Sequence, residues 1–205
     1  MILLAVDTTS QLATAALFRE GVLITEREAD PAKKHAETVM PMIDFLLEQS
    51  GVSISDVDLF AVDIGPGSFT GVRIGVSLVN AMAFALNRKI VAVDALRALY
   101  EASGEPDRPV CTLIDARNGN AYAALYQAGE PLIEPCAVET EAWLSKVPKD
   151  AILIGDLAAE ERTYPRAEYI GRTALKKLSA AASEAEPLYL RPSQAERLKK
   201  PQEKA

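Results

Sequence analysis

The sequence predicts an α/β fold of two similar halves, each of which opens with a β-hairpin on a mixed sheet. Strand-length apolar runs (ILLAVD, LFAVDI, KIVAVD) alternate with helical segments in the first half. The second half repeats the opening pattern of a strand ending in Asp, a polar turn and a strand, as LLAVDTTSQLATAALF beside CTLIDARNGNAYAALY shows. With 49% hydrophobic residues, 205 residues can also bury a sizeable core.

In the first half, three strands joined by tight turns precede an alternation of helix and strand. Polar or glycine-containing turns at TTSQ and Glu20-Gly21 separate the first three apolar runs. The expected strands are 2–7, 12–18, 22–28, 59–64 and 89–94, and the expected helices are about 34–49 and 71–86.

A stretch of turn residues, SGEPDRP at 103–109, separates the halves. We therefore predict a first subdomain over 1–104, joined by the C-terminal tail 188–205, and a smaller second subdomain over 105–187. In the second half we expect strands at 110–115, 121–127, 151–156 and 168–170, a helix near 139–146 and another helix to Ser183.

Composition favours a cytoplasmic protein that does not bind polyanions by itself. Asp and Glu (29) outnumber Lys and Arg (22), giving a net charge of −7. The basic surplus lies in the tail and is more typical of a solvated helix face than of a nucleic-acid contact. The N-terminus lacks a basic signal-peptide region, and no apolar run approaches the ~20 residues of a membrane span. Cys111 and Cys136 have no metal-like spacing, and Cys111 is expected in the core.

The segment DIGPGSFTGVRIG at 63–75 contains the most distinctive turn. It has no lysine, so it is not a Walker loop, and its glycine spacing does not fit GxGxxG. Pro66 and Gly67 are expected to turn the chain, and Ser68 or Thr70 to cap the following helix. Backbone N–H groups at that helix start could hold an anion.

The duplicated strand–Asp–hairpin pattern resembles the actin-like (ASKHA) fold, in which a glycine after the Asp approaches a phosphate. Here Asp7 is present, but Thr8, Thr9 and Ser10 follow it. Their hydroxyls could bind a phosphate, although shaping the turn is the simpler role. The candidate anion- or nucleotide-adjacent residues are Asp7, Thr8, Thr9, Gly67 and Ser68.

The two long helices predict a partner interface. The helix over 71–86 is apolar on nearly all sides, and the helix over 34–49 has a wide apolar stripe. Gly71 and Gly75, four residues apart, would let another helix come close. A charge at Val76 or Ile43 is expected to break partner binding without disturbing the fold. The expected interface residues are His35, Glu37, Val39, Met42, Ile43, Leu46, Val72, Arg73, Ile74, Val76 and Val79.

His35 is the only histidine in the sequence. A metal site needs several ligands, and the position four residues later is Val39. Packing or capping is therefore the expected role of His35. From the residues we expect no metal site and no catalytic residue.

Four segments together resemble the bacterial TsaB (YeaZ) family: LLAVDTTS, KKHAETVMPMIDFLL, LFAVDIGPGSFTGVRIGVSLVNAMAFAL and DARNGNAYAALY. The resemblance covers residues 1–127 and the tail motif YLRPSQAE. It implies an actin-like fold and a non-catalytic relative of TsaD, the catalytic subunit that modifies tRNA. TsaD carries an HxxxH iron-type motif, whereas the matching positions here, near Ala95 and Leu99, are apolar.

The resemblance further implies a scaffold that activates TsaD as a heterodimer and contacts the ATPase TsaE. That complex transfers a threonylcarbamoyl group to N6 of adenosine 37 in tRNA, giving t6A. The chain would meet tRNA through the complex, hold no cofactor of its own, and share any ATP or ADP with TsaD at their interface. The same surface could form a homodimer of the isolated chain.

Two enzyme functions remain as alternative hypotheses. An actin-like ATP-dependent small-molecule kinase would use a carboxylate near Asp7, Asp63 or Asp115, but the phosphate-turn glycine is missing and the chain is short for that class. A stand-alone peptidase would need metal ligands or a nucleophile–base triad, and the sequence supplies neither.

Overall fold

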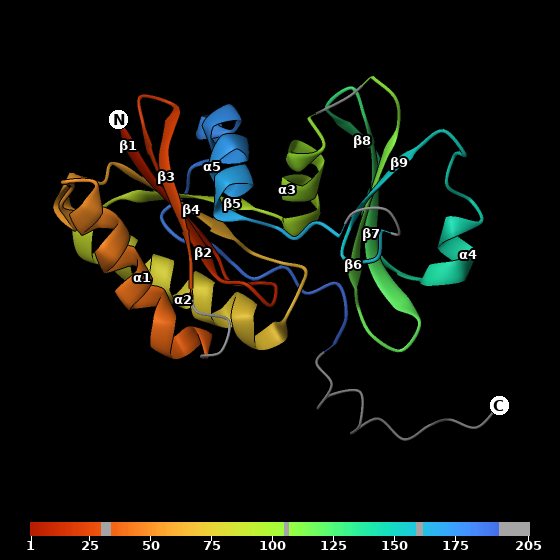
Figure 1. Ribbon diagram of the computed structural model, residues 1–205, viewed down its shortest axis with the longest axis horizontal. Helices are drawn as coiled ribbons and strands as arrows, with labels where there is room; N and C mark the ends of the chain where they lie inside the picture. The colour runs from red at the N-terminus through yellow and green to blue at the C-terminus, as the bar shows by residue number, and fades with distance from the viewer. Residues whose placement is uncertain (30–33, 105–106, 159–161, 193–205) are drawn as a thin grey trace.

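The computed structural model describes residues 1–29, 34–104, 107–158 and 162–192, which form two sheets with helices packed around them (Figure 1). The first sheet has the strand order β3-β2-β1-β4-β5 and the second β8-β7-β6-β9. The first sheet contains β1 (Ile2–Asp7), β2 (Thr14–Arg19), β3 (Val22–Glu28), β4 (Leu59–Asp63) and β5 (Lys89–Val93). The second contains β6 (Val110–Asp115), β7 (Asn120–Gln127), β8 (Glu130–Glu139) and β9 (Ile152–Gly155).

Both sheets are built on the same topology. In each, an antiparallel hairpin (β1–β2 or β6–β7) is extended by a strand parallel to its first member (β4 or β9). Asp7 ends β1 opposite Thr14, and Asp115 ends β6 opposite Ala121. The predicted α/β fold of two similar actin-like halves, each opening with a hairpin on a mixed sheet, is therefore confirmed.

Helices cover both faces of the first sheet (Figure 1). The helices α1 (His35–Gln49) and α2 (Phe69–Leu86) lie on one face, and α5 (Ala167–Lys176) lies on the other. The Ser68 hydroxyl caps α2 by accepting a hydrogen bond from the Gly71 N–H (3.2 Å), and Asn87 ends it in a left-handed conformation. Each fully buried Val, Leu or Ile side chain in this core contributes about 1.5–3 kcal/mol.

The strand expected at 168–170 is wrong, because this segment is part of α5. Ala167, Ile170, Gly171 and Ala174 lie at helical spacing and are buried. A Cβ at Gly171 would lie 2.1 Å from the Phe18 ring, so glycine allows α5 to lie close to the sheet. Although the sequence grouped 167–176 with the second half, their apolar contacts are with the first sheet.

Two further elements were not expected. Helix α3 (Ala95–Ala102) begins where the Asp94 carboxylate accepts a hydrogen bond from the Arg97 N–H (2.8 Å), and it packs its apolar side against the second sheet. Strand β8 carries two prolines and lies at the sheet edge, where proline is tolerated. Short helical segments complete the fold: α4 (Thr140–Leu144), η1 (Ile54–Asp56) and η2 (Leu178–Ala180).

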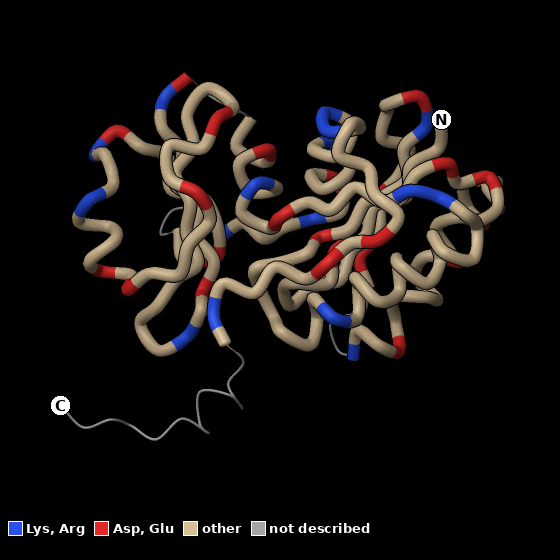
Figure 2. The backbone as a smooth tube through the Cα atoms, turned by 180° about the vertical axis from the view of Figure 1, so that it is seen from behind, with Lys and Arg blue, Asp and Glu red and all other residues tan. Residues whose placement is uncertain are grey.

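The C-terminal strap, residues 186–192, connects the two halves. The Leu188 N–H donates to the Ile64 carbonyl (2.8 Å) in the first half. Arg191 Nη1 donates to the Ala116 carbonyl (3.2 Å) in the second half. The rest of the basic tail predicted from the sequence, 193–205, lies outside the described residues. Elsewhere in the described chain, acidic and basic residues are interspersed over both halves (Figure 2).

Candidate functional site

Asp7 and Asp63, at the ends of neighbouring parallel strands, form a buried acid pair. Neither side chain is exposed to solvent. The Thr9 hydroxyl lies 2.8 Å from Asp7 Oδ1 and 3.0 Å from Asp63 Oδ2. One hydroxyl has one proton to donate, so the second contact requires a proton on a carboxyl group. Both contacts are satisfied when protonated Asp63 donates to Thr9 Oγ1 and Thr9 donates to Asp7, whose Oδ2 is buried without a hydrogen-bond partner among the described residues.

Burial is the main cause of the altered acidity of this pair. It raises the pKa of Asp7 to about 6, against the lowering effect of hydrogen bonds from Thr9. Burial, together with the negative charge of Asp7, raises the pKa of Asp63 well above its usual value of 3.8. The Gly65 N–H donates to Asp63 Oδ1 (2.7 Å), which partly opposes that increase.

The turn after Asp7 is fastened directly to the start of α2. Thr8 Oγ1 donates to the Gly71 carbonyl (2.7 Å), and the Ser68 N–H donates to the Thr9 carbonyl (2.7 Å). A Cβ at Gly71 would lie 1.9 Å from the Thr8 carbonyl oxygen, and one at Gly75 would lie 2.4 Å from Thr8 Oγ1. These glycines therefore make room for the hairpin turn, and not for another helix as the sequence suggested.

This packing restricts the predicted anion-adjacent residues. The N–H groups of Ser68, Gly71 and Val72 all have partners within the chain. Asp7 and Thr8 are fully buried, whereas Thr9, Gly67 and Ser68 line a cavity. Anion binding at this turn stays a prediction, and in this structure it would have to use the cavity-lining residues alone.

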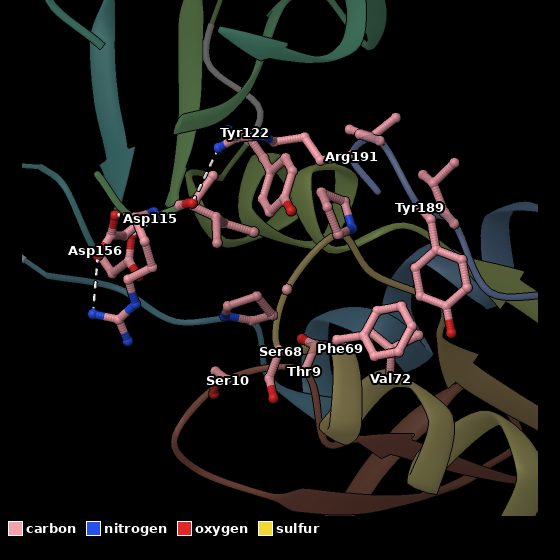
Figure 3. A pocket seen from close by; sticks show the side chains of 18 of the residues that line it. Thr9, Ser10, Ser68, Phe69, Val72, Asp115, Tyr122, Asp156, Tyr189 and Arg191 are labelled. Atoms are coloured by element: carbon pink, nitrogen blue, oxygen red, sulfur yellow. Dashed lines mark hydrogen bonds and ion pairs between the residues drawn. The ribbon is translucent and has the colours of Figure 1, made fainter. Parts of the chain in front are cut away.

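The cavity, about 450 Å³ in volume, lies between the two halves (Figure 3). We call it the cleft. Its first-half wall is the turn after β1 and the start of α2; its second-half wall is the β6–β7 turn and the segment after β9; the strap forms a third wall. The residues that supply its polar or aromatic groups include Thr9, Ser10, Ser68, Phe69, Asp115, Tyr122, Asp156 and Arg191.

Asp115 and Asp156 bring two carboxylates to the second-half wall (Figure 3). Asp115 Oδ1 accepts from the Arg117 N–H (2.7 Å), and Asp115 Oδ2 forms an ion pair with Arg117 Nη1 (3.2 Å). Asp156 Oδ1 accepts from the Asp115 N–H (2.8 Å), and burial raises the pKa of Asp156. Sequence reasoning found Asp115 but missed Asp156, because AILIGD was interpreted only as a strand.

The kinase alternative needs an accessible carboxylate. Of its three candidates, Asp7 and Asp63 are fully buried and Asp115 lines the cleft.

Across residues 1–29, 34–104, 107–158 and 162–192, no group of three or more His, Cys, Asp or Glu side chains is placed to hold a metal ion. Ala95 and Leu99, near which the sequence analysis expected the counterparts of the TsaD motif, are buried in α3. His35 Nε2 lies 3.0 Å from the Ser10 carbonyl oxygen, a packing role.

Most of the expected interface side chains point into the core. Their burial leaves them no surface for a partner, and a charge at Val76 or Ile43 would disrupt the fold itself. Glu37 and Arg73 are exposed, and His35 and Ile74 are partly exposed. The buried members are Val39, Met42, Ile43, Leu46, Val72, Val76 and Val79.

The opposite side of α2 is exposed and nearly uncharged, whereas that of α1 presents Met40 and Phe45 together with the acids Glu37, Asp44 and Glu48. Phe84 is 88% exposed, and Met40 and Phe45 on α1 are 41% and 45% exposed. We define the α1–α2 outer face by Met40, Ile74, Ser77, Ala81 and Phe84; the Phe45 ring lies instead against the Arg27 guanidinium of β3, 4.8 Å from its centroid. Arg73 is the only charged residue in the 18 residues of α2, where a solvated helix face normally carries several.

Because of this composition, α2 has the length and hydropathy of a membrane span, contrary to the expectation from sequence. It is the one such helix in the described chain. The criterion is weak, because core helices of soluble proteins also meet it. Here one side of α2 packs on the first sheet in the protein core.

Comparison with known sequences identifies relatives. Residues 27–195 match the family model described as TsaD, tRNA N6-adenosine threonylcarbamoyltransferase. The chain is 34% identical over 145 residues to the tRNA threonylcarbamoyladenosine biosynthesis protein TsaB of Bacillus subtilis, and 33% over 132 residues to that of Escherichia coli. These alignments cover 71% and 63% of this chain but 63% and 57% of the two relatives. TsaB of Haemophilus influenzae is 28% identical, with 92% of this chain and 93% of the relative covered.

Two solved structures from Pseudomonas aeruginosa share the fold over nearly the whole chain. A protein described as similar to peptidase YEAZ has a TM-score of 0.80 and 29% identity, covering 93% of this chain and 99% of its own. The structure described as YeaZ has a TM-score of 0.75 and 28% identity, covering 92% and 99%. The chain therefore belongs to the TsaD family and, within that family, to its TsaB (YeaZ) group.

Proposed function

We propose that this protein is a non-catalytic subunit in t6A synthesis, and that it activates a TsaD-like catalytic partner by binding it through the α1–α2 outer face. The names of its TsaB relatives support the pathway. The observation that carries the binding mode is the nearly uncharged exposed side of α2, with Phe84 88% exposed. Exposed apolar faces of this kind are typical of protein interfaces.

The absence of catalysis by this chain is supported by how its first half is closed. Thr8 and Thr9 fill the space beside the start of α2, and both strand-end acids there are sealed from solvent. A general acid or base must come within hydrogen-bond reach of its substrate, and these two buried carboxyl groups instead hydrogen-bond to Thr9 in the turn.

Other parts of the proposal rest on the family resemblance. They are contact with a TsaE-like ATPase, access to tRNA through the complex, ATP or ADP held jointly with the partner, and a cytoplasmic location. An apolar outer face of this kind would also support a homodimer of the isolated chain, in which the same surface meets a second copy.

Reconstitution tests the function. The chain would be combined with the TsaD-like and TsaE-like proteins of its own organism, the threonylcarbamoyl-AMP-forming enzyme and tRNA, and t6A would be measured by mass spectrometry. We expect t6A only when the chain is present, and a loss of at least tenfold with Phe84→Glu.

The matched control is Val22→Glu, which places the same charge on another exposed apolar residue (68% exposed) away from both helices. It should leave t6A formation unchanged. Equal t6A formation with and without the chain would contradict the proposed function. Equal activity of Phe84→Glu and wild type would contradict the assigned surface.

A further inference from the structure

The equivalent acids of the two halves have different surroundings. Asp7 and Asp115 both end the first hairpin strand, and each accepts a hydrogen bond from the N–H two residues later (2.8 and 2.7 Å). In the first half the Thr9 hydroxyl closes the site over both acids. In the second half Arg117 stands in the position of Thr9, and its side chain is 76% exposed. The second-half acids consequently face the cleft.

Asp156 is the carboxylate to which Arg117 is not directly paired, although the Arg117 charge partly opposes the burial that raises the pKa of Asp156. Arg117 forms its ion pair with Asp115. Among the described residues Asp156 forms no ion pair, and the hydrogen bond from the Asp115 N–H uses Oδ1. A half-buried carboxylate beside a second carboxylate favours a positively charged ligand group.

Arg191 supplies the opposite charge to the same cleft. Its Nη1 donates to the Ala116 carbonyl (3.2 Å), which holds the guanidinium beside the β6–β7 turn (Figure 3). A guanidinium has five N–H donors, and this contact uses one of them. Guanidinium groups bind carboxylates through paired hydrogen bonds.

We propose that the cleft binds a small zwitterion of the amino-acid type, with its ammonium group at Asp156 and its carboxylate at Arg191. The Ser68 hydroxyl, which accepts from the Gly71 N–H, lies on the facing wall and can donate its proton to a ligand, whereas Ser10 Oγ is engaged with the Leu12 backbone. The Tyr122 ring offers an apolar face (Figure 3). The cavity of about 450 Å³ accommodates an amino acid with several waters, each of which occupies about 30 Å³.

The charge balance of the cleft favours this class over nucleotides and simple amines. Asp115, Asp156, Arg117 and Arg191 sum to zero formal charge, so a ligand with two separated and opposite charges leaves the site neutral. A nucleotide would bring several negative charges to a wall that carries two carboxylates. A simple amine would leave the Arg191 donors unused. This site is separate from the α1–α2 outer face, so the inference does not depend on partner binding.

Ligand-observed NMR on the full chain tests the inference. The twenty L-amino acids would be screened at pH 7.5, with ethanolamine and acetate as probes that carry only one of the two charges, and AMP as a competing class. We expect at least one amino acid to bind saturably and at least tenfold more tightly than ethanolamine, acetate or AMP. Asp156→Asn and Arg191→Gln should each weaken that binding at least tenfold.

Asp150→Asn and Arg19→Gln are the matched controls, because they make the same chemical changes at exposed residues outside the cleft. They should leave binding unchanged. In the wild-type chain, amide shifts caused by the ligand should centre on 115–117 and 156, a readout that does not rely on a variant folding. Absence of saturable amino-acid binding, preference for AMP, or shifts centred elsewhere would overturn the proposal.

Discussion

The raised pKa values of the buried acids Asp7 and Asp63 predict how stability depends on pH, and Asp63→Asn tests this dependence. An acid whose pKa is higher in the folded state binds its proton more tightly there. Its contribution to stability is full below the unfolded pKa of 3.8 and is lost as pH rises through the folded value, about 6 for Asp7. The Asp7 contribution is thus lost mainly between pH 3.8 and about 6, and we expect Asp63, whose pKa is raised well above 3.8, to make the free energy of unfolding fall further as pH rises from 5.5 to 8.5.

The magnitude follows from the shift. For Asp7, moving the pKa from 3.8 to about 6 corresponds to a loss of about 3 kcal/mol in the free energy of unfolding across that pH range, at 1.36 kcal/mol per pKa unit. Asp63→Asn replaces the second acid with a neutral group of the same shape. The new amide can accept from the Gly65 N–H and donate to Thr9 Oγ1, so no hydrogen bond is lost. Burial and the Asp7 charge oppose ionisation of Asp63 but not a neutral amide, so above the folded pKa of Asp63 the variant should gain about 1.4 kcal/mol over wild type for each pKa unit of that shift.

Urea denaturation followed by circular dichroism at pH 5.5, 7.0 and 8.5 measures the effect. Asp150→Asn, an exposed aspartate, is the control and should follow the wild-type pH dependence. The reasoning is refuted if wild type and Asp63→Asn show the same change in unfolding free energy between pH 5.5 and 8.5. It is also refuted if the variant is the less stable protein at pH 8.5.

Three further predictions concern other parts of the fold. Gly71→Ala should destabilise the fold by at least about 2 kcal/mol in urea denaturation, because its Cβ would lie 1.9 Å from the Thr8 carbonyl oxygen; an unchanged midpoint would contradict this. Glu26→Gln should cost about 1–3 kcal/mol by weakening the ion pair with Arg166 that fastens α5 to β3, and a loss under 0.3 kcal/mol would count against it. Folded protein should protect Cys111 from a thiol reagent at pH 8, because burial raises its pKa to about 11; rapid labelling by mass spectrometry would disprove this.

The sequence predicted the strands of both hairpins and the two long helices because their apolar runs are strong and bounded by polar turns. It missed β8, whose prolines at 131 and 135 are typical of loops and are tolerated only because the strand is at an edge. It divided α5 between strand and helix because the buried stripe of that helix is short. Short elements of this kind are decided by tertiary contacts, which no local pattern contains.

The predicted interface shows a different limit of what a sequence pattern can distinguish. An apolar residue such as Val79 has the same pattern whether it faces its own sheet or a partner, and here it faces the sheet. The informative feature is the side of α2 that lacks charge although it is exposed. The glycines of GPGSFTG were similarly ambiguous, because a close approach of the turn at Thr8 and a close approach of a ligand both require the absence of a Cβ. Asp156 could have been found by asking which acids follow parallel strands in both halves.

The most direct test of the account is the affinity of the chain for the TsaD-like protein of its own organism, measured by isothermal titration calorimetry for wild type, Phe84→Glu and Val22→Glu. A charge buried in an apolar interface should cost at least about 2 kcal/mol, or roughly 30-fold in Kd. We expect the Kd to rise by that factor for Phe84→Glu and to keep the wild-type value for Val22→Glu. Tight binding by Phe84→Glu, or no binding by the wild-type chain, would contradict it.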